Sequence, residues 1–249
     1  MRLRIIFSKT NALRYTSHLD LRTIWERTVR RAGLPLAYTQ GFHPGPKIQV
    51  ASALPLGFIG RAEIVDIWLQ NNTGAGVVPT HGDQSPPKRE ESRPYAELLQ
   101  SAAPQGLNIA CVIEVDEHAP ALQTRVCSAE YEVTLLGPAD RSKLEGKLAQ
   151  LLQAISLPRE RRGKVYDLRP LIEEITLSPS PPSPLPKGEG DRGEGSRVRI
   201  NMRLAARPGA TGRPEEVLDA LGVQSETARI ERTRLILKTQ LPLEENDIK

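Results

Sequence analysis

Arginine side chains clustered on one predicted helix are the residues of this sequence best suited to chemistry with a phosphate-bearing ligand. Arg22, Arg27, Arg30 and Arg31 follow one another within a single short stretch. A guanidinium group presents parallel N–H donors that match phosphate oxygens. Because Glu26 lies four residues from both Arg22 and Arg30, a self-paired, solvated helix face is the alternative interpretation.

An aromatic, glycine- and proline-rich segment follows that helix at residues 38–47, YTQGFHPGPK. Glycines allow close backbone approach to a ligand, and prolines restrict the backbone before binding. Rings of Tyr and His can stack on bases, and a Lys can contact a phosphate. We expect Phe42 to lie in the core instead. A stiff connection that only plugs the core is the alternative. The predicted nucleic-acid site, which we expect to form one electropositive hollow, comprises Arg22, Arg27, Arg30, Arg31, Tyr38, Gly41, His43 and Lys47.

His18 is the one candidate for catalysis, and it lies at the start of the predicted helix. A helix N-terminus disfavours the imidazolium form, so a neutral His18 able to act as a base is one interpretation. With Lys47 or Arg22 stabilising charge, such a base fits a metal-independent ribonuclease. A purely structural histidine at a helix start is the alternative.

Positive charge is concentrated at the beginning of the chain. Residues 1–50 carry a net charge of +7, whereas the whole sequence carries +4, so the remainder sums to −3. This asymmetry favours a surface that faces a polyanion. Hydrophobic content of 39% and charged content of 26% are ordinary for a soluble globular protein.

The sequence predicts no metal and no cofactor site. Its two cysteines, Cys111 and Cys127, form no C-x-x-C pair, and no two histidines share one helix turn. A phosphate-binding G-x-x-x-x-G-K-[ST] loop is also missing. So few cysteines, and no apolar run of about 20 residues, predict a cytoplasmic protein without a membrane span.

The elements that position these residues predict an α+β fold. Ser17 and Asp20 resemble a capping box, and apolar residues at helical spacing predict a helix over 18–32 that ends before Gly33. Further helices are predicted at 95–102, 141–155 and 214–221. Strands or extended segments are predicted at 2–8, 36–39, 48–54, 62–69, 107–115, 129–136, 164–177, 198–205 and 228–237.

This order gives β-α-β-β-α-β twice, which predicts tandem ferredoxin-like domains. The expected domains span residues 1–120 and 121–249. Polar, breaker-rich stretches at 72–93 and 178–196 predict a disordered insertion in each domain.

Several motifs resemble one bacterial family. They are Y-T-S-H-L-D-L at residues 15–21, R-R-A-G-L-P-L-A-Y-T-Q-G-F-H-P-G-P-K at 30–47, L-P-L-G at 54–57, K-V-Y-D-L-R-P-L-I at 164–172 and G-R-P-E-E-V-L at 212–218. Read together, they resemble the radical-SAM-associated domain of unknown function, found fused behind radical-SAM modules or as a separate protein. The resemblance covers nearly the whole chain except the two insertions.

What the resemblance implies is association with a radical-SAM protein and with RNA metabolism. This chain lacks the three-cysteine cluster motif, so radical-SAM chemistry would come from a partner. We therefore expect a non-catalytic module that binds RNA or presents a substrate. The alternatives are a ribonuclease that uses His18 and an adaptor that binds only protein.

Overall fold

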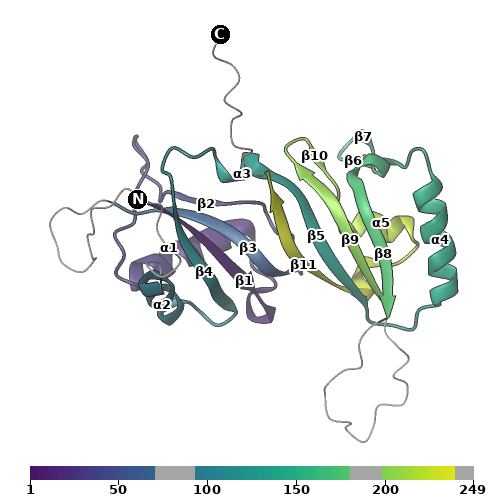
Figure 1. Ribbon diagram of the computed structural model, residues 1–249, viewed down its shortest axis with the longest axis horizontal. Helices are drawn as coiled ribbons and strands as arrows, with labels where there is room; N and C mark the ends of the chain where they lie inside the picture. The colour runs from purple at the N-terminus through teal and green to yellow at the C-terminus, as the bar shows by residue number, and fades with distance from the viewer. Residues whose placement is uncertain (71–92, 180–197, 239–249) are drawn as a thin grey trace, which may run out of the picture.

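Nine strands form a single mixed sheet in the computed structural model, which describes residues 1–70, 93–179 and 198–238 (Figure 1). Five α-helices accompany it, and a separate two-stranded hairpin completes the strands of the described residues. The architecture is α+β, as the sequence predicts. Both halves of the chain contribute to the one sheet.

In the first half, the strands run in the spatial order β4-β1-β3-β2, and all pairs are antiparallel. The strands are β1 (Arg2–Lys9), β2 (Ile48–Val50), β3 (Ile59–Trp68) and β4 (Leu107–Val115). Helix α1 (His18–Arg31) connects β1 to β2, and α2 (Arg93–Ala102) connects β3 to β4.

The second half repeats this order as β11-β5-β9-β8, again with antiparallel pairs. Its strands are β5 (Val126–Leu135), β8 (Ile172–Pro179), β9 (Val198–Arg207) and β11 (Ala228–Leu237), with a short β10 (Ala210–Thr211) beside β9. Helices α4 (Arg141–Gln153) and α5 (Pro214–Ala220) are its crossovers, and α3 (Leu122–Arg125) precedes β5.

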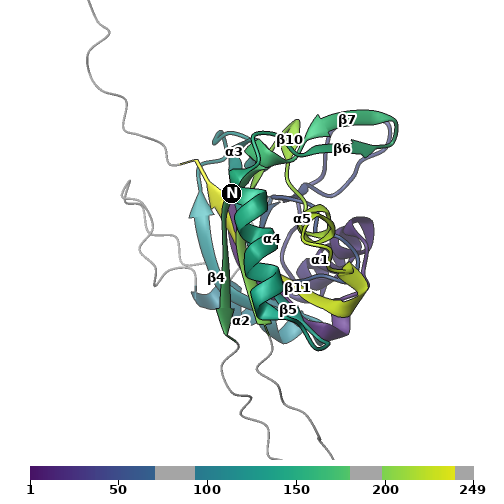
Figure 2. The ribbon, with the colours of Figure 1, turned by 90° about the vertical axis from the view of Figure 1, so that its right-hand side faces the viewer.

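One edge of β3 joins the halves. The end of β3 pairs with β2, while its beginning pairs in parallel with β11, through Glu231 opposite Ile59 and Arg232 opposite Gly60. Because both halves then run in the same direction, right-handed crossovers bring their helices to the same side of the sheet. Figure 2 shows α1 and α5 on one side.

Helix α1 forms where the sequence predicts it, because both its ends and its apolar face are encoded locally. The Ser17 hydroxyl accepts from the Asp20 N–H, and Asp20 accepts from the Ser17 N–H in return, which closes the predicted capping box. Leu21 and Trp25 are buried, and the Trp25 ring meets the edge of Phe7 at 5.0 Å. Gly33 follows with a φ of +71°, which favours glycine.

Other boundaries differ from the prediction. Residues 36–39 form two isolated bridges in place of a strand, and strand 48–54 shortens to β2. The stretch predicted as extended from 164 contains the second strand of a hairpin, β6 (Pro158–Arg161) and β7 (Lys164–Asp167), before β8 begins. The insertions predicted at 72–93 and 178–196 lie outside the described residues, except that Arg93 begins α2 and residues 178–179 end β8.

Part of the positive charge at the start of the chain is internal. Arg2 and Arg4 are buried and both donate to the fully buried Asp66, at 2.6–2.9 Å. Lys9 is buried as well, and its Nζ donates to the Thr16 carbonyl at 3.0 Å. The net charge of residues 1–50 therefore overstates the charge that this region presents to solvent.

A buried ion pair fastens the two halves together. Arg232 of β11 donates through Nε to Glu63 of β3 at 2.8 Å, and a second guanidinium N–H bonds the other Glu63 oxygen. The same guanidinium reaches the backbone carbonyls of Ser52 and Ala53 at 3.0 and 3.1 Å. Both partners are about 2% exposed or less, so every charge here depends on its partner.

We expect Glu63→Gln, or Arg232→Met, to lower the free energy of unfolding by about 3–5 kcal/mol, because each leaves one buried charge unpaired. Guanidinium denaturation measures the change. The double variant Glu63→Leu with Arg232→Met should recover much of the loss, since no charge then remains unpaired. Single variants within about 1 kcal/mol of the wild type would contradict a central role for this pair.

Candidate nucleic-acid interface

Two arginines of α1 fasten the predicted binding segment to the helix. Arg22 donates to the Pro46 carbonyl at 3.0 Å, and Arg30 donates to the Tyr38 hydroxyl at 2.5 Å. Arg30 also pairs with Glu26 at 2.9 Å. Its hydrogen bond with Tyr38, together with the charge of Glu26, raises the pKa of Arg30. The structure thus brings Arg22, Arg30 and Tyr38 together, although much of the donor capacity of Arg30 is used internally.

The segment is closed at its base and exposed at its tip. Thr39 and Gly45 are joined by two hydrogen bonds, Thr39 N–H to the Gly45 carbonyl at 2.8 Å and Gly45 N–H to Thr39 Oγ1 at 3.0 Å. Residues 40–44 between them are exposed. Gly41 has a φ of +136°, a conformation that residues with a side chain rarely adopt.

Phe42 corrects one prediction. Its side chain is fully exposed at 102% of the reference area, whereas we expected it in the core. The tip projects beyond the last bridge at Tyr38 and Pro46, so no apolar surface is within its reach. Exposed beside His43, the Phe42 ring is available for stacking against a flat ligand.

Arg27 and Arg31 lie further around α1. Both are exposed, and neither has a hydrogen-bond or carboxylate partner among the described residues. At 3.6 residues per turn they stand about 140° and 180° from Arg22 around the helix axis. They extend the basic surface outward, away from the contact between Arg22 and Pro46.

Lys47 directly precedes β2, and the alternation of the extended chain orients its side chain. Its neighbour Ile48 packs into the core beneath α1, so Lys47 projects toward the opposite face of the sheet. There it contributes to lowering the pKa of Glu117, after the larger effect of the amino terminus. Of the predicted site, Lys47 is therefore the residue that lies apart from the α1 arginines.

His18 is half-buried at the first turn of α1. Its Nδ1 is shielded from solvent and has no hydrogen-bond partner among the described residues, and the same holds for Nε of Arg22 one turn later. The Ser17 hydroxyl and N–H bond the nearby Asp20 and lower the pKa of that carboxyl group. Chemistry at His18 would therefore use its other nitrogen, Nε2.

Arginines on the sheet face away from the helices are paired with carboxylates at short distances. We call this surface the open sheet face. Arg203 and Arg234 both meet Glu130, at 2.8 and 2.9 Å, and Arg61 meets Glu132 at 2.8 Å. The bonds from Arg234 and Arg203 lower the pKa of Glu130. Charges on this face largely cancel one another, which leaves few donors for a ligand.

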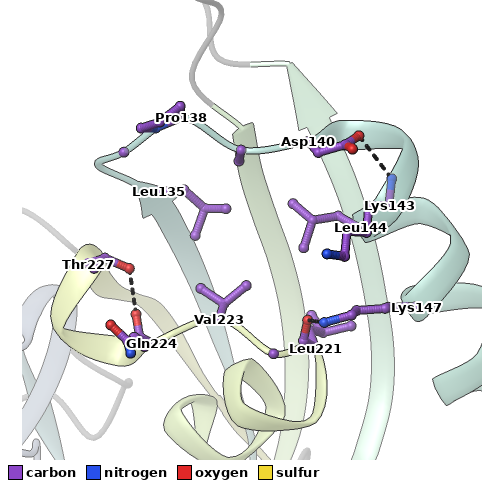
Figure 3. A pocket seen from close by; sticks show the side chains of 13 residues that line it. Leu135, Pro138, Asp140, Lys143, Leu144, Lys147, Leu221, Val223, Gln224 and Thr227 are labelled. Carbon is purple, nitrogen blue, oxygen red and sulfur yellow. Dashed lines mark hydrogen bonds between the residues drawn. The ribbon is translucent and has the colours of Figure 1, made fainter.

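A hollow of about 310 Å³ lies between α4 and the chain after α5 (Figure 3). Leu135, Leu144 and Val223 line it, with two lysines of α4 at its rim. Lys147 donates to the Leu221 carbonyl at 2.9 Å, and the Lys143 N–H is capped by Asp140. These polar groups complete the ends of α4 and α5, so the hollow offers less to a ligand than the α1 surface.

Sequence reasoning missed one group of exposed cations. Arg161, Arg162 and Lys164 lie at the end of the β6–β7 hairpin. The predicted extended segment begins only at Lys164, so it left out the first strand of the hairpin and its turn. The signal was present as a single Gly in a short, strongly polar stretch, which is typical of a turn.

The described residues contain no group of three or more His, Cys, Asp or Glu side chains that could hold a metal ion. Cys111 and Cys127 are both free thiols. No helix within the described ranges is long and apolar enough to cross a membrane.

Comparison with protein families gives a match over most of the chain. Residues 2–214 match the model of a family described as uncharacterized proteins conserved in bacteria, DUF2344. No curated protein matches the sequence.

Solved structures give distant likenesses. A Cbf5–Nop10–Gar1 complex contains a chain with 12% identity and a TM-score of 0.45, covering 94% of this chain and 48% of that one. An archaeal box H/ACA sRNP Nop10–Cbf5 complex, and an H/ACA RNP bound to a substrate RNA containing 2′-deoxyuridine, give 12% identity with TM-scores of 0.40 and 0.41. The chain spans about half the length of these chains. Likenesses this distant carry no argument about function.

We expect Arg22→Ala to loosen the segment 38–47, because the variant removes the bond from α1 to the Pro46 carbonyl. Hydrogen exchange followed by mass spectrometry should show faster exchange in peptides that cover residues 39–47. Arg27→Ala is the matched control, since Arg27 has no partner to lose, and its exchange should equal the wild type. Equal exchange in both variants would mean that the hydrogen bonds between Thr39 and Gly45 suffice to hold the segment.

Proposed function

The chain belongs to this bacterial family, and from that premise we propose that it is a non-catalytic, cytoplasmic RNA-binding or substrate-presenting module that works with a radical-SAM protein. The observation that carries the RNA part is the pair Arg27 and Arg31, exposed on α1 without a carboxylate partner among the described residues. Unpaired guanidinium groups on a rigid helix are suited to phosphate contacts.

The exposed tip supports the same proposal. Phe42 and His43 stand in the open beyond a base that two hydrogen bonds close. A ring that already lies outside the core costs little to place on a base, and stacking is worth about 1–3 kcal/mol per base. We assign phosphate contacts to Arg27 and Arg31, and base contacts to Phe42 and His43. In this proposal the segment is positioned by Arg22, Arg30, Tyr38 and Gly41. Lys47, which projects toward the opposite face of the sheet, takes no part in the contact.

The proposed division into domains follows from the strand orders. Each half has the order and antiparallel pairing of a β-α-β-β-α-β unit. We interpret residues 1–120 and 121–249 as two ferredoxin-like domains that share a sheet. The partner is the part of the proposal that rests on the resemblance of the sequence motifs to radical-SAM-associated proteins.

We expect the protein to bind single-stranded RNA with an affinity that falls steeply as salt rises. The double charge reversal Arg27→Glu and Arg31→Glu should weaken binding and reduce the slope of log K against log salt by about 1.4, the value for two phosphate contacts. Fluorescence anisotropy with a labelled 20-nucleotide RNA from 50 to 200 mM salt measures both quantities.

The matched control reverses two exposed cations of the second half, Arg207→Glu and Lys238→Glu, and should leave the slope unchanged. Absence of RNA binding at 50 mM salt would end the proposal. If a radical-SAM protein is then captured in a way that survives nuclease and high salt, the chain is a protein-binding adaptor.

The ribonuclease alternative is favoured by one observation: His18 lies one helical turn from Arg22 on α1, and Nε2 is the His18 nitrogen left for proton transfer. We expect intact RNA after incubation with the protein in chelator, because the nearby carboxylate of Asp20 is already engaged by Ser17 in the capping box. Gel electrophoresis of the labelled RNA is the measurement. Cleavage products that appear with the wild type and vanish with His18→Ala would establish the enzyme instead.

A further inference from the structure

The β6–β7 hairpin stands outside the main sheet. Within the described residues its strands pair with each other alone, from Pro158 opposite Asp167 to Arg161 opposite Lys164. The two residues of its turn, Arg162 and Gly163, have φ angles of +50° and +73°. Two successive positive φ angles are the mark of a type I′ turn, whose twist suits a tight hairpin. The turn therefore presents its neighbours on a stiff, narrow support.

Cations predominate at the end of this hairpin, and they are weakly paired. Arg162 and Lys164 have no carboxylate partner among the described residues. The carboxylate that pairs with Arg161 is that of Glu216, at a distance of 3.9 Å. That separation exceeds the roughly 2.7–2.9 Å of a charge-assisted hydrogen bond, so the hairpin keeps most of its donors available.

Arg213 adds to the same positive region from the start of α5. Burial lowers the pKa of Arg213, and the nearby charges of Arg161 and Arg162 lower it further against the opposing effect of Glu215. Its own pair with Glu216 is long, at 3.6 Å. A guanidinium group whose charged form is disfavoured in this way would be stabilised by an additional anion.

Arginines on the open sheet face can be compared with those of the hairpin. On that face, Arg203, Arg234 and Arg61 meet carboxylate oxygens at 2.8–2.9 Å. Arginines are thus available for a ligand on the hairpin and are already bound on the open sheet face. Figure 2 shows the hairpin on the same side of the sheet as α5 and α1.

We propose that the end of the β6–β7 hairpin, through Arg162 and Lys164, is a second contact for the phosphates of the RNA that α1 binds. The inference rests on the proposed function and extends it from one helix to both halves of the chain. The bound strand would cross the helical side of the sheet, from the tip at Phe42 toward the hairpin. Recognition there is of phosphate charge and not of base identity.

The test removes the two charges without disturbing the hairpin. Arg162→Asn places the preferred Asn-Gly pair in a type I′ turn, and Lys164→Thr keeps a residue that favours strands. In the anisotropy titration with the 20-nucleotide RNA, the double variant should reduce the salt slope by about 1.4. Between 50 and 200 mM salt, the loss of affinity should then be about sevenfold smaller than for the wild type.

Two controls separate the possible failures. The thermal midpoint of the double variant should not fall below that of the wild type, which shows that the hairpin is intact. If Arg27→Glu with Arg31→Glu weakens binding while the hairpin variant keeps the wild-type slope, the hairpin inference is wrong and the proposed function stands. If the wild type itself does not bind the RNA, both are wrong.

Discussion

The fold depends on the placement of one arginine where no water reaches it. Arg232 lies in the interior between the halves, and Glu63 with two backbone carbonyls satisfies its donors. Desolvating such a pair costs several kcal/mol per ion, which only close, multiple hydrogen bonds offset. Because Arg232 belongs to β11 and Glu63 to β3, those bonds form only when the halves meet in one register. Any other register would leave a buried charge unpaired, which is strongly destabilising.

The arginines of this chain differ in burial and pairing because they differ in which carboxylates the strands bring opposite them. Arg2 and Arg4 on β1 face Asp66 across a strand pair, which makes them part of the interior. Arg203 and Arg234 meet Glu130 on the open sheet face, where the register aligns them. Helix α1 and the β6–β7 hairpin carry arginines outside the main sheet, where no neighbouring strand supplies carboxylates in register. Buried, paired and exposed arginines cannot be told apart by composition. They are distinguished by the geometry of their pairing.

How far the sequence predicts this structure depends on how local each signal is. Helix α1 was predictable because Ser17, Asp20 and Gly33 specify its ends within a few residues. The burial of Arg2 and Arg4 was not, because it depends on Asp66, more than sixty residues away. Phe42 was misplaced because hydrophobicity indicates the core on average, whereas the projecting tip leaves that ring without any apolar neighbour.

The candidate surface was partly predictable, because part of it depends on local signals within one helix. Helical spacing placed Arg22 and Arg30 on one row of α1, and the structure shows that this row meets the segment 38–47. Lys47 was grouped with them because it is the last residue of the segment, yet alternation of the extended chain turns it toward Glu117 on the other side. The union of the two halves into one sheet escaped prediction, because nothing within either half encodes the contact between β3 and β11.

The contact between β3 and β11 also has a consequence while the chain is being synthesised on the ribosome. Glu63 and the beginning of β3 leave the exit tunnel well before Arg232 is translated, so a nascent first half holds a carboxylate whose final partner does not yet exist. Lys9 is the cation then nearby; burial lowers the pKa of Lys9, against the opposing effect of the Glu63 charge. Until β11 arrives, the first residues of β3 expose unpaired backbone groups at a sheet edge, which is the kind of surface that invites association between chains. Completion of the last strand therefore both neutralises the interior and closes that edge in a single step.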